Sequence, residues 1–140
     1  MGRVIHTDST GKNRNRLMRT CAELIRHLVT KTTVDDEARD MLARLIESLQ
    51  EIDAGLEASA EAWEKRDYWM KAEQLRQRWA WVGLNASKLE HLIKTEDWQR
   101  VPDLLIKLLP HFADIKVTRF TRGPEEWAGA YKRVIGQMQK

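Results

Sequence analysis

The chain has few of the residues that interrupt helices or cross-link distant segments: three prolines, seven glycines and one cysteine among 140 residues. The single cysteine, Cys21, excludes a disulfide within the chain and any zinc site built from several cysteines. The remaining sequence is rich in alanine, leucine, glutamate, lysine, arginine and glutamine, which have the highest helix propensities. The composition therefore predicts an all-α fold, and the length suits one domain.

Long apolar segments are also missing. The longest stretch without a charged residue, Trp79–Ser87, has nine residues, whereas a helix needs roughly 20 to span a bilayer. The first residues contain no apolar segment of the length found in signal peptides. We therefore expect a cytoplasmic protein without membrane contacts, with a flexible, irregular N-terminal arm at 1–11 and a single all-helical domain at 12–140.

Charge is unevenly distributed along the chain. Residues 1–31 have a net charge of +5, residues 32–106 of −6 and residues 107–140 of +4. The basic ends can pack against the acidic middle, in the same chain or in a second copy, or they can bind a polyanion such as nucleic acid. The sequence leaves both interpretations open.

Hydrophobic periodicity predicts the first two helices. Apolar residues recur at helical spacing from about Lys12 to Thr30, and again over about 34–63, where the stripe is longest. Thr33, with Asp36 three residues later, is predicted to cap the second helix. The two stripes consist of Leu17, Cys21, Leu24, Ile25 and Leu28, and of Ala38, Met41, Leu42, Leu45, Leu49, Ile52, Leu56, Ala60 and Trp63.

A third stripe, over about 66–94, is rotated by roughly 100° from the second on a continuous helical wheel. Either the chain turns near 64–67, or one long helix changes its packing partner along its length. The absence of glycine and proline between Leu56 and Val82 favours one long bent helix, with Gly83 as the next stop. The third stripe consists of Tyr68, Ala72, Leu75, Trp79, Val82, Ala86, Leu89 and Ile93.

The C-terminal third predicts shorter elements. Pro102 suits the first turn of a helix, and Pro110 should end or kink that helix. Ile115–Phe120 alternates apolar and polar residues, but it has no obvious pairing partner and is predicted as an extended crossover. Pro124 is expected to open the last helix. The whole chain is thus predicted as a bundle of five to six helices.

Motifs for catalysis and metal binding are scarce. The histidines, at positions 6, 27, 91 and 111, do not pair at a metal-binding spacing. Glu23 lies one turn before His27, which indicates a local ion pair. No complete phosphate-binding loop and no nucleophile elbow occurs. We therefore expect no catalytic residue, cofactor or bound metal.

Two acidic clusters nevertheless leave an enzymatic alternative open. Asp35, Asp36 and Glu37 fit the acidic first turn of a helix. Glu61 and Glu64 have the Glu-x-x-Glu spacing seen in all-helical nucleotide pyrophosphatases, although no second acidic motif completes such a site. A Mg²⁺-dependent hydrolase of a phosphorylated small molecule is therefore one alternative function.

Tryptophan is unusually abundant, with six residues in the chain. Trp81 falls off the third stripe and Trp69 lies at its edge, a placement typical of a second contact surface, formed either with another helix of the same chain or with a partner. The leading hypothesis is a non-enzymatic helical protein-interaction or adaptor module that self-associates. Its candidate partner-binding residues are Trp69, Trp81, Arg76 and Arg78.

Aromatic rings interleaved with lysine and arginine can also stack on bases and contact phosphates. Nucleic-acid binding by the basic arm and the first helix is therefore the principal alternative. The candidate residues for this function are Lys12, Arg14, Arg16 and Arg19.

Overall fold

A computed structural model describes the backbone of residues 6–139 and the side chains of residues 11–139. The described residues contain no strand, which confirms the predicted all-α class, and they form six α-helices with three short 3₁₀ helices. The α-helices are α1 (His6–Thr30), α2 (Asp36–Lys65), α3 (Trp69–Arg78), α4 (Ala80–Lys94), α5 (Val101–Leu108) and α6 (Ala130–Met138). The 3₁₀ helices are η1 (Trp98–Arg100), η2 (Leu109–Phe112) and η3 (Pro124–Glu126).

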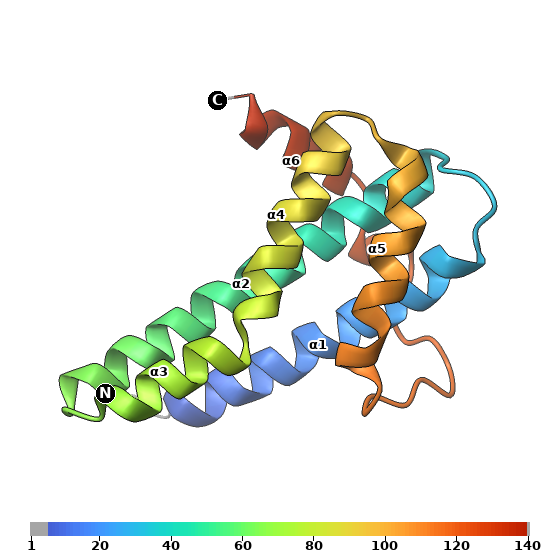
Figure 1. Ribbon diagram of the computed structural model, residues 1–140. Helices are drawn as coiled ribbons and strands as arrows, with labels where there is room; N and C mark the ends of the chain where they lie inside the picture. The colour runs from blue at the N-terminus through green and yellow to red at the C-terminus, as the bar shows by residue number, and fades with distance from the viewer. Residues whose placement is uncertain (1–5, 140) are drawn as a thin grey trace.

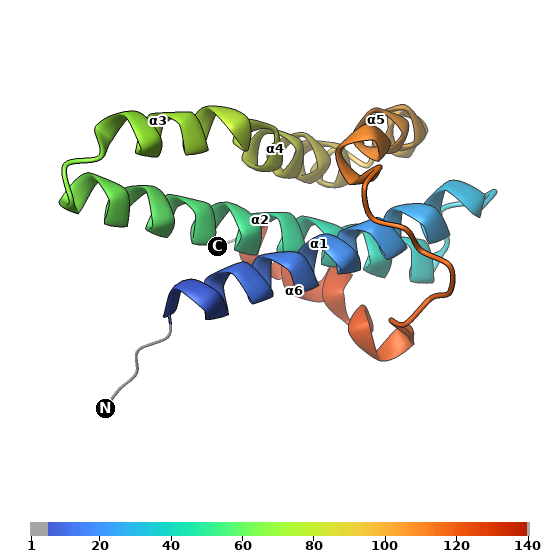
Figure 2. The ribbon, with the colours of Figure 1, turned by 90° about the horizontal axis from the view of Figure 1, so that it is seen from below.

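Helix α2 is the centre of the fold. It packs against α1, α3, α4 and α6, with α3 and α4 on one side and α6 on another (Figures 1 and 2). The apolar stripe of α1 and that of α2 as far as Ala60 are buried, as their spacing predicts. The main cluster of buried side chains extends from Leu17 in α1 to Trp127 before α6.

Two helix starts differ from those predicted. Helix α1 begins at His6 rather than Lys12, so residues 6–11 of the predicted irregular arm are helical, and residues 1–5 of that arm lie outside the described residues. The N-cap of α2 is Asp35 rather than Thr33, because Asp35 Oδ1 accepts a 2.8 Å hydrogen bond from Ala38 N. Lys31 Nζ holds the same carboxylate at 3.1 Å.

The favoured continuous helix through 64–67 is wrong, and the alternative of a turn is confirmed. Asp67 adopts a left-handed conformation, with φ 65°, and Tyr68 N donates to Trp63 O at 2.9 Å. Aspartate tolerates this conformation better than most residues, so the chain reverses without glycine. Helix α3 then folds back along α2 (Figure 2). Of the third stripe, Ala72 and Val82 are buried within the chain, whereas Tyr68 is exposed.

The predicted helix over 66–94 is divided at Trp79, which ends α3 and precedes α4. Gly83 lies inside α4 and is not a stop. Gly83 lies close to the Asp53 side chain of α2. A Cβ atom at this position would lie only 3.0 Å from Asp53 Oδ2. The sequence predicts a helix that continues through Trp79 and stops near Gly83. In the structure the helix instead breaks at Trp79 and continues through Gly83.

The C-terminal elements follow the proline signals in part. Pro102 lies in the first turn of α5, and Pro110 lies in η2, where the α-helix has given way to a 3₁₀ helix. Residues 115–120 are irregular, as predicted for a crossover. Pro124 opens only η3, because Gly129 with φ 78° separates it from α6. None of the described helices combines the length and apolarity needed to cross a bilayer.

Candidate interaction surfaces

The turn between α2 and α3 presents the most exposed run of large apolar side chains. Tyr68 is 50% exposed, Trp69 61% and Met70 75%. Lys65, Arg66 and Lys71 are exposed beside them, and Asp67 supplies one carboxylate. We call residues 65–71 the hairpin tip. It lies at one end of the molecule, away from α5 and α6 (Figures 1 and 2).

The base of the hairpin tip is held by aromatic contacts. The edge of the Tyr68 ring meets Trp63, with the ring centroids 5.6 Å apart. Lys71 Nζ lies 4.9 Å from the Trp63 centroid and 5.3 Å from that of Tyr68, within the range of a cation–π contact. Two wholly buried alanines, Ala60 and Ala72, allow α2 and α3 to pack closely. The tip is therefore a supported turn that leaves Trp69 and Met70 facing solvent.

The Arg76 guanidinium donates its hydrogen bonds to carboxylates of its own chain. Its guanidinium bonds Glu64 at 2.6 and 3.1 Å and Glu57 at 2.8 and 3.1 Å. The hydrogen bonds with Glu64, and then those with Glu57, raise the pKa of Arg76. Arg76 thus ties α3 to α2 and is not a free partner contact, whereas Arg78 is exposed in the last turn of α3.

The same contacts bear on the Glu61 and Glu64 pair. Glu64 is bound by Arg76, which lowers the pKa of its carboxyl, and Glu61 is exposed. Asp35 is likewise engaged as the N-cap of α2. Across the part of the chain that the structure describes, no three His, Cys, Asp or Glu side chains are grouped to hold a metal ion.

Trp81 lies in an intramolecular aromatic cluster. Its ring stacks on His111, with centroids 4.0 Å apart and an interplanar angle of 11°. Trp79 stacks on it at 6.0 Å, and Phe112 meets it edge-on at 5.5 Å. Of the two tryptophans predicted as partner contacts, Trp69 is exposed, whereas Trp81 is half-buried by its own chain.

The four basic residues predicted to bind nucleic acid also differ in their surroundings: some are exposed and others are bound within the chain. Lys12 and Arg16 are exposed, and the Arg16 side chain donates to the nearby Asn13 Oδ1 at 2.7 Å. The Arg14 guanidinium lies 5.6 Å from the Trp79 ring centroid. Arg19 donates to Glu23 at 2.7 Å and to the carbonyl oxygens of two residues in the crossover. The structure does not bring these four residues together as one free cationic patch.

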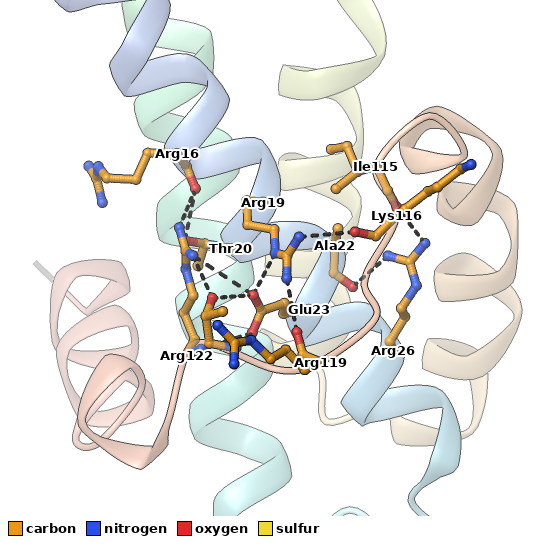
Figure 3. A network of polar contacts seen from close by, with 11 residues as sticks. Arg16, Arg19, Thr20, Ala22, Glu23, Arg26, Ile115, Lys116, Arg119 and Arg122 are labelled. Carbon is orange, nitrogen blue, oxygen red and sulfur yellow. Dashed lines mark hydrogen bonds and ion pairs between the residues drawn. The ribbon is translucent and has the colours of Figure 1, made fainter.

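Glu23, which local spacing assigns to an ion pair with His27, is the centre of a buried polar network (Figure 3). Its side chain is 0% exposed. It accepts hydrogen bonds from Thr121 Oγ1 at 2.6 Å, from Thr121 N at 2.7 Å and from Arg122 N at 2.9 Å, besides that from Arg19. His27 instead stacks on Phe120, with ring centroids 3.8 Å apart, so the predicted ion pair is wrong.

Further arginine contacts fix the crossover along α1 (Figure 3). Arg122 donates to Thr20 Oγ1 at 3.0 Å and to Arg16 O at 2.9 Å. Arg26 donates to Ile115 O at 2.9 Å. Arg19, Arg26 and Arg122, which belong to the two basic ends of the chain, therefore donate hydrogen bonds within the fold.

The Glu23 network predicts a dependence of stability on pH. Burial alone would raise the pKa of Glu23, but the hydrogen bonds from Arg19, Thr121 and Arg122 outweigh it and hold the pKa at about 2, against 4.5 for a free glutamate. Because the pKa is lower in the folded state, the stabilisation is complete above about pH 4.5 and is lost as the pH falls towards 2. The difference corresponds to about 3 kcal/mol of unfolding free energy.

Urea denaturation of the wild type and of Glu23→Gln, measured from about pH 6 to about pH 2.5, tests this expectation. The free-energy difference between the two proteins should shrink as the pH falls. A difference that stays constant over this range would show that Glu23 is not a carboxylate held by these donors.

The exposed tip tryptophan could be anticipated from its place at the edge of the apolar stripe, but no signal in the sequence marks Met70. The stripe places Tyr68 on the buried face, whereas the turn at 66–68 rotates it outward. Comparison with known proteins adds nothing to these surfaces: no family model, no curated protein and no solved structure matches the chain.

Proposed function

We propose that the chain is a non-enzymatic protein-interaction module of the cytoplasm that binds its partner through the hairpin tip. The observation that carries the proposal is the exposure of Trp69 and Met70, side by side, on a turn held by Trp63, Tyr68 and Lys71. Tryptophan, methionine and arginine are enriched in the cores of protein interfaces. A supported turn also loses little conformational entropy when it binds.

The chemistry of the hairpin tip favours a partner other than a second copy. Two tips in contact would bring Lys65, Arg66 and Lys71 against their own like charges, opposed by one carboxylate each from Asp67. One continuous helix would need a second copy to cover the third apolar stripe, but most of that stripe beyond Tyr68 is buried or half-buried within the chain. The fitting partner surface is an apolar pocket bordered by carboxylates.

Site-specific photo-cross-linking tests the proposal. A benzophenone side chain in place of Trp69 should give an adduct with one partner protein in an extract of the source cells, because this side chain would enter the partner's pocket. The same side chain in place of Ile106 of α5, which is 58% exposed, provides a control of similar exposure away from the tip. The control should not give that adduct.

Three results would contradict the proposal. Equal labelling from positions 69 and 106 would show that no surface is selected. An adduct between two copies of the purified chain would show self-association through the tip. Oligonucleotide binding that weakens steeply with salt and with Arg16→Ala would favour the nucleic-acid alternative instead.

A further inference from the structure

A second surface, independent of the hairpin tip, lies between α4 and α5. The two helices form an open groove of about 660 Å³. Its apolar lining includes Leu84, which is 56% exposed, and the half-buried Leu92, with the largely buried Leu104 at its floor.

The charged side chains along the groove are mainly basic. Lys88 of α4 and Lys107 of α5 lie along its two helices, with Arg100 towards the η1 end. Asp103 is the one acidic residue of the lining, and Arg100 is paired with Asp97 at 3.1 Å. Within the described chain, no salt bridge engages Lys88 or Lys107.

The dimensions of the groove suit a helix of a few turns. Leu84 and Leu92 are eight positions apart on α4, which is about 12 Å along a helix axis. The stack of Trp81 on His111 of η2 lies one turn before Leu84, at the start of α4. The opposite end is bounded by the turn through Arg100.

We propose that this groove binds an acidic amphipathic helix of a partner protein. Leucines or similar residues of the partner would contact Leu84, Leu92 and Leu104, and its carboxylates would pair with Lys88 and Lys107. The aliphatic lining argues against nucleic acid, which is bound through aromatic stacking and phosphate contacts. With the hairpin tip, the groove gives the chain two separated surfaces, as an adaptor requires.

A designed peptide tests the groove even while the partner is unidentified. The probe is a fluorescein-labelled peptide of leucine and glutamate, about three helical turns long, with leucines at i, i+3, i+4 and i+7. A matched peptide has lysine in place of every glutamate. Fluorescence anisotropy measures the binding of each peptide to the wild type, to Lys88→Glu/Lys107→Glu and to Leu84→Ser.

The acidic peptide should bind the wild type, and Lys88→Glu/Lys107→Glu should weaken this binding by at least about tenfold. The same variant should bind the basic peptide better than the wild type does. Leu84→Ser should also weaken binding of the acidic peptide. The control Lys116→Glu/Lys132→Glu, which makes the same change of net charge at exposed sites elsewhere, should leave binding unchanged.

Other outcomes overturn the proposal. These are no binding of the acidic peptide, equal binding of both peptides to the wild type, or an equal loss in the control variant. A loss caused by Trp69→Ser/Met70→Ser but not by Lys88→Glu/Lys107→Glu would place the peptide at the hairpin tip. Since the two surfaces are altered by different substitutions, failure of the groove would leave the proposed function of the tip intact.

Discussion

Glu23→Ala is expected to lower the free energy of unfolding by about 3–5 kcal/mol. The side chain is wholly buried and accepts four hydrogen bonds. Its removal leaves the backbone N–H groups of Thr121 and Arg122 and the Nε–H of Arg19 without their acceptor in a partly buried site. Urea denaturation followed by far-ultraviolet circular dichroism at neutral pH measures the loss.

Glu73→Ala is the matched control, because Glu73 is exposed on α3 and accepts only a long hydrogen bond, of 3.4 Å, from Gln77 Nε2. It should change the stability by no more than about 0.5 kcal/mol. In Glu23→Ala, amide hydrogen exchange should also accelerate in residues 115–122, since the crossover loses its main anchor. Similar losses in both variants, or unchanged exchange, would contradict the structural role of Glu23.

Phe112→Ala is expected to cost about 3–5 kcal/mol. Phe112 is among the largest wholly buried side chains; η2 packs against α1 and α5, and the Phe112 ring meets Trp81 of α4. Its truncation would remove apolar burial and leave a cavity beside Trp81, whose ring it contacts edge-on. We expect a lower unfolding free energy and a red shift of the tryptophan emission, because water would reach the Trp81 ring.

The control for Phe112→Ala is Ile106→Ala, one helical turn and a half earlier, where the side chain is 58% exposed. It should cost less than about 1 kcal/mol, because little apolar surface is buried there. A small effect of Phe112→Ala, similar to that of Ile106→Ala, would show that η2 is not part of the packed core.

The helices could be predicted from sequence wherever their signal is local. The stripe over 34–63 predicts α2 to within two residues at each end, because each of its turns buries the same face. Pro102 likewise marks the start of α5. The turn at Asp67 could not be distinguished from a bend, because it contains neither glycine nor proline. The rotation between the two stripes was its only signal.

The surroundings of several individual side chains could not be predicted, because their contacts come from residues distant in the sequence. Glu23 has a histidine one turn away, but its actual partners, Thr121 and Arg122, are nearly one hundred residues later. Trp81 is covered by His111 and Phe112 from η2, so its place off the stripe did not imply exposure. Trp69, at the edge of the stripe, is exposed, because its surroundings are formed by its own hairpin.

The binding role of the hairpin tip is tested most directly by calorimetric titration of the purified partner, once it is identified by cross-linking. The titration compares the wild type with Trp69→Ser/Met70→Ser, and the melting temperatures of both proteins are measured alongside. Loss of two exposed interface anchors should weaken binding by about 100-fold or more with little change in melting temperature, since neither side chain is buried. Equal affinity of the two proteins for the partner would contradict the account.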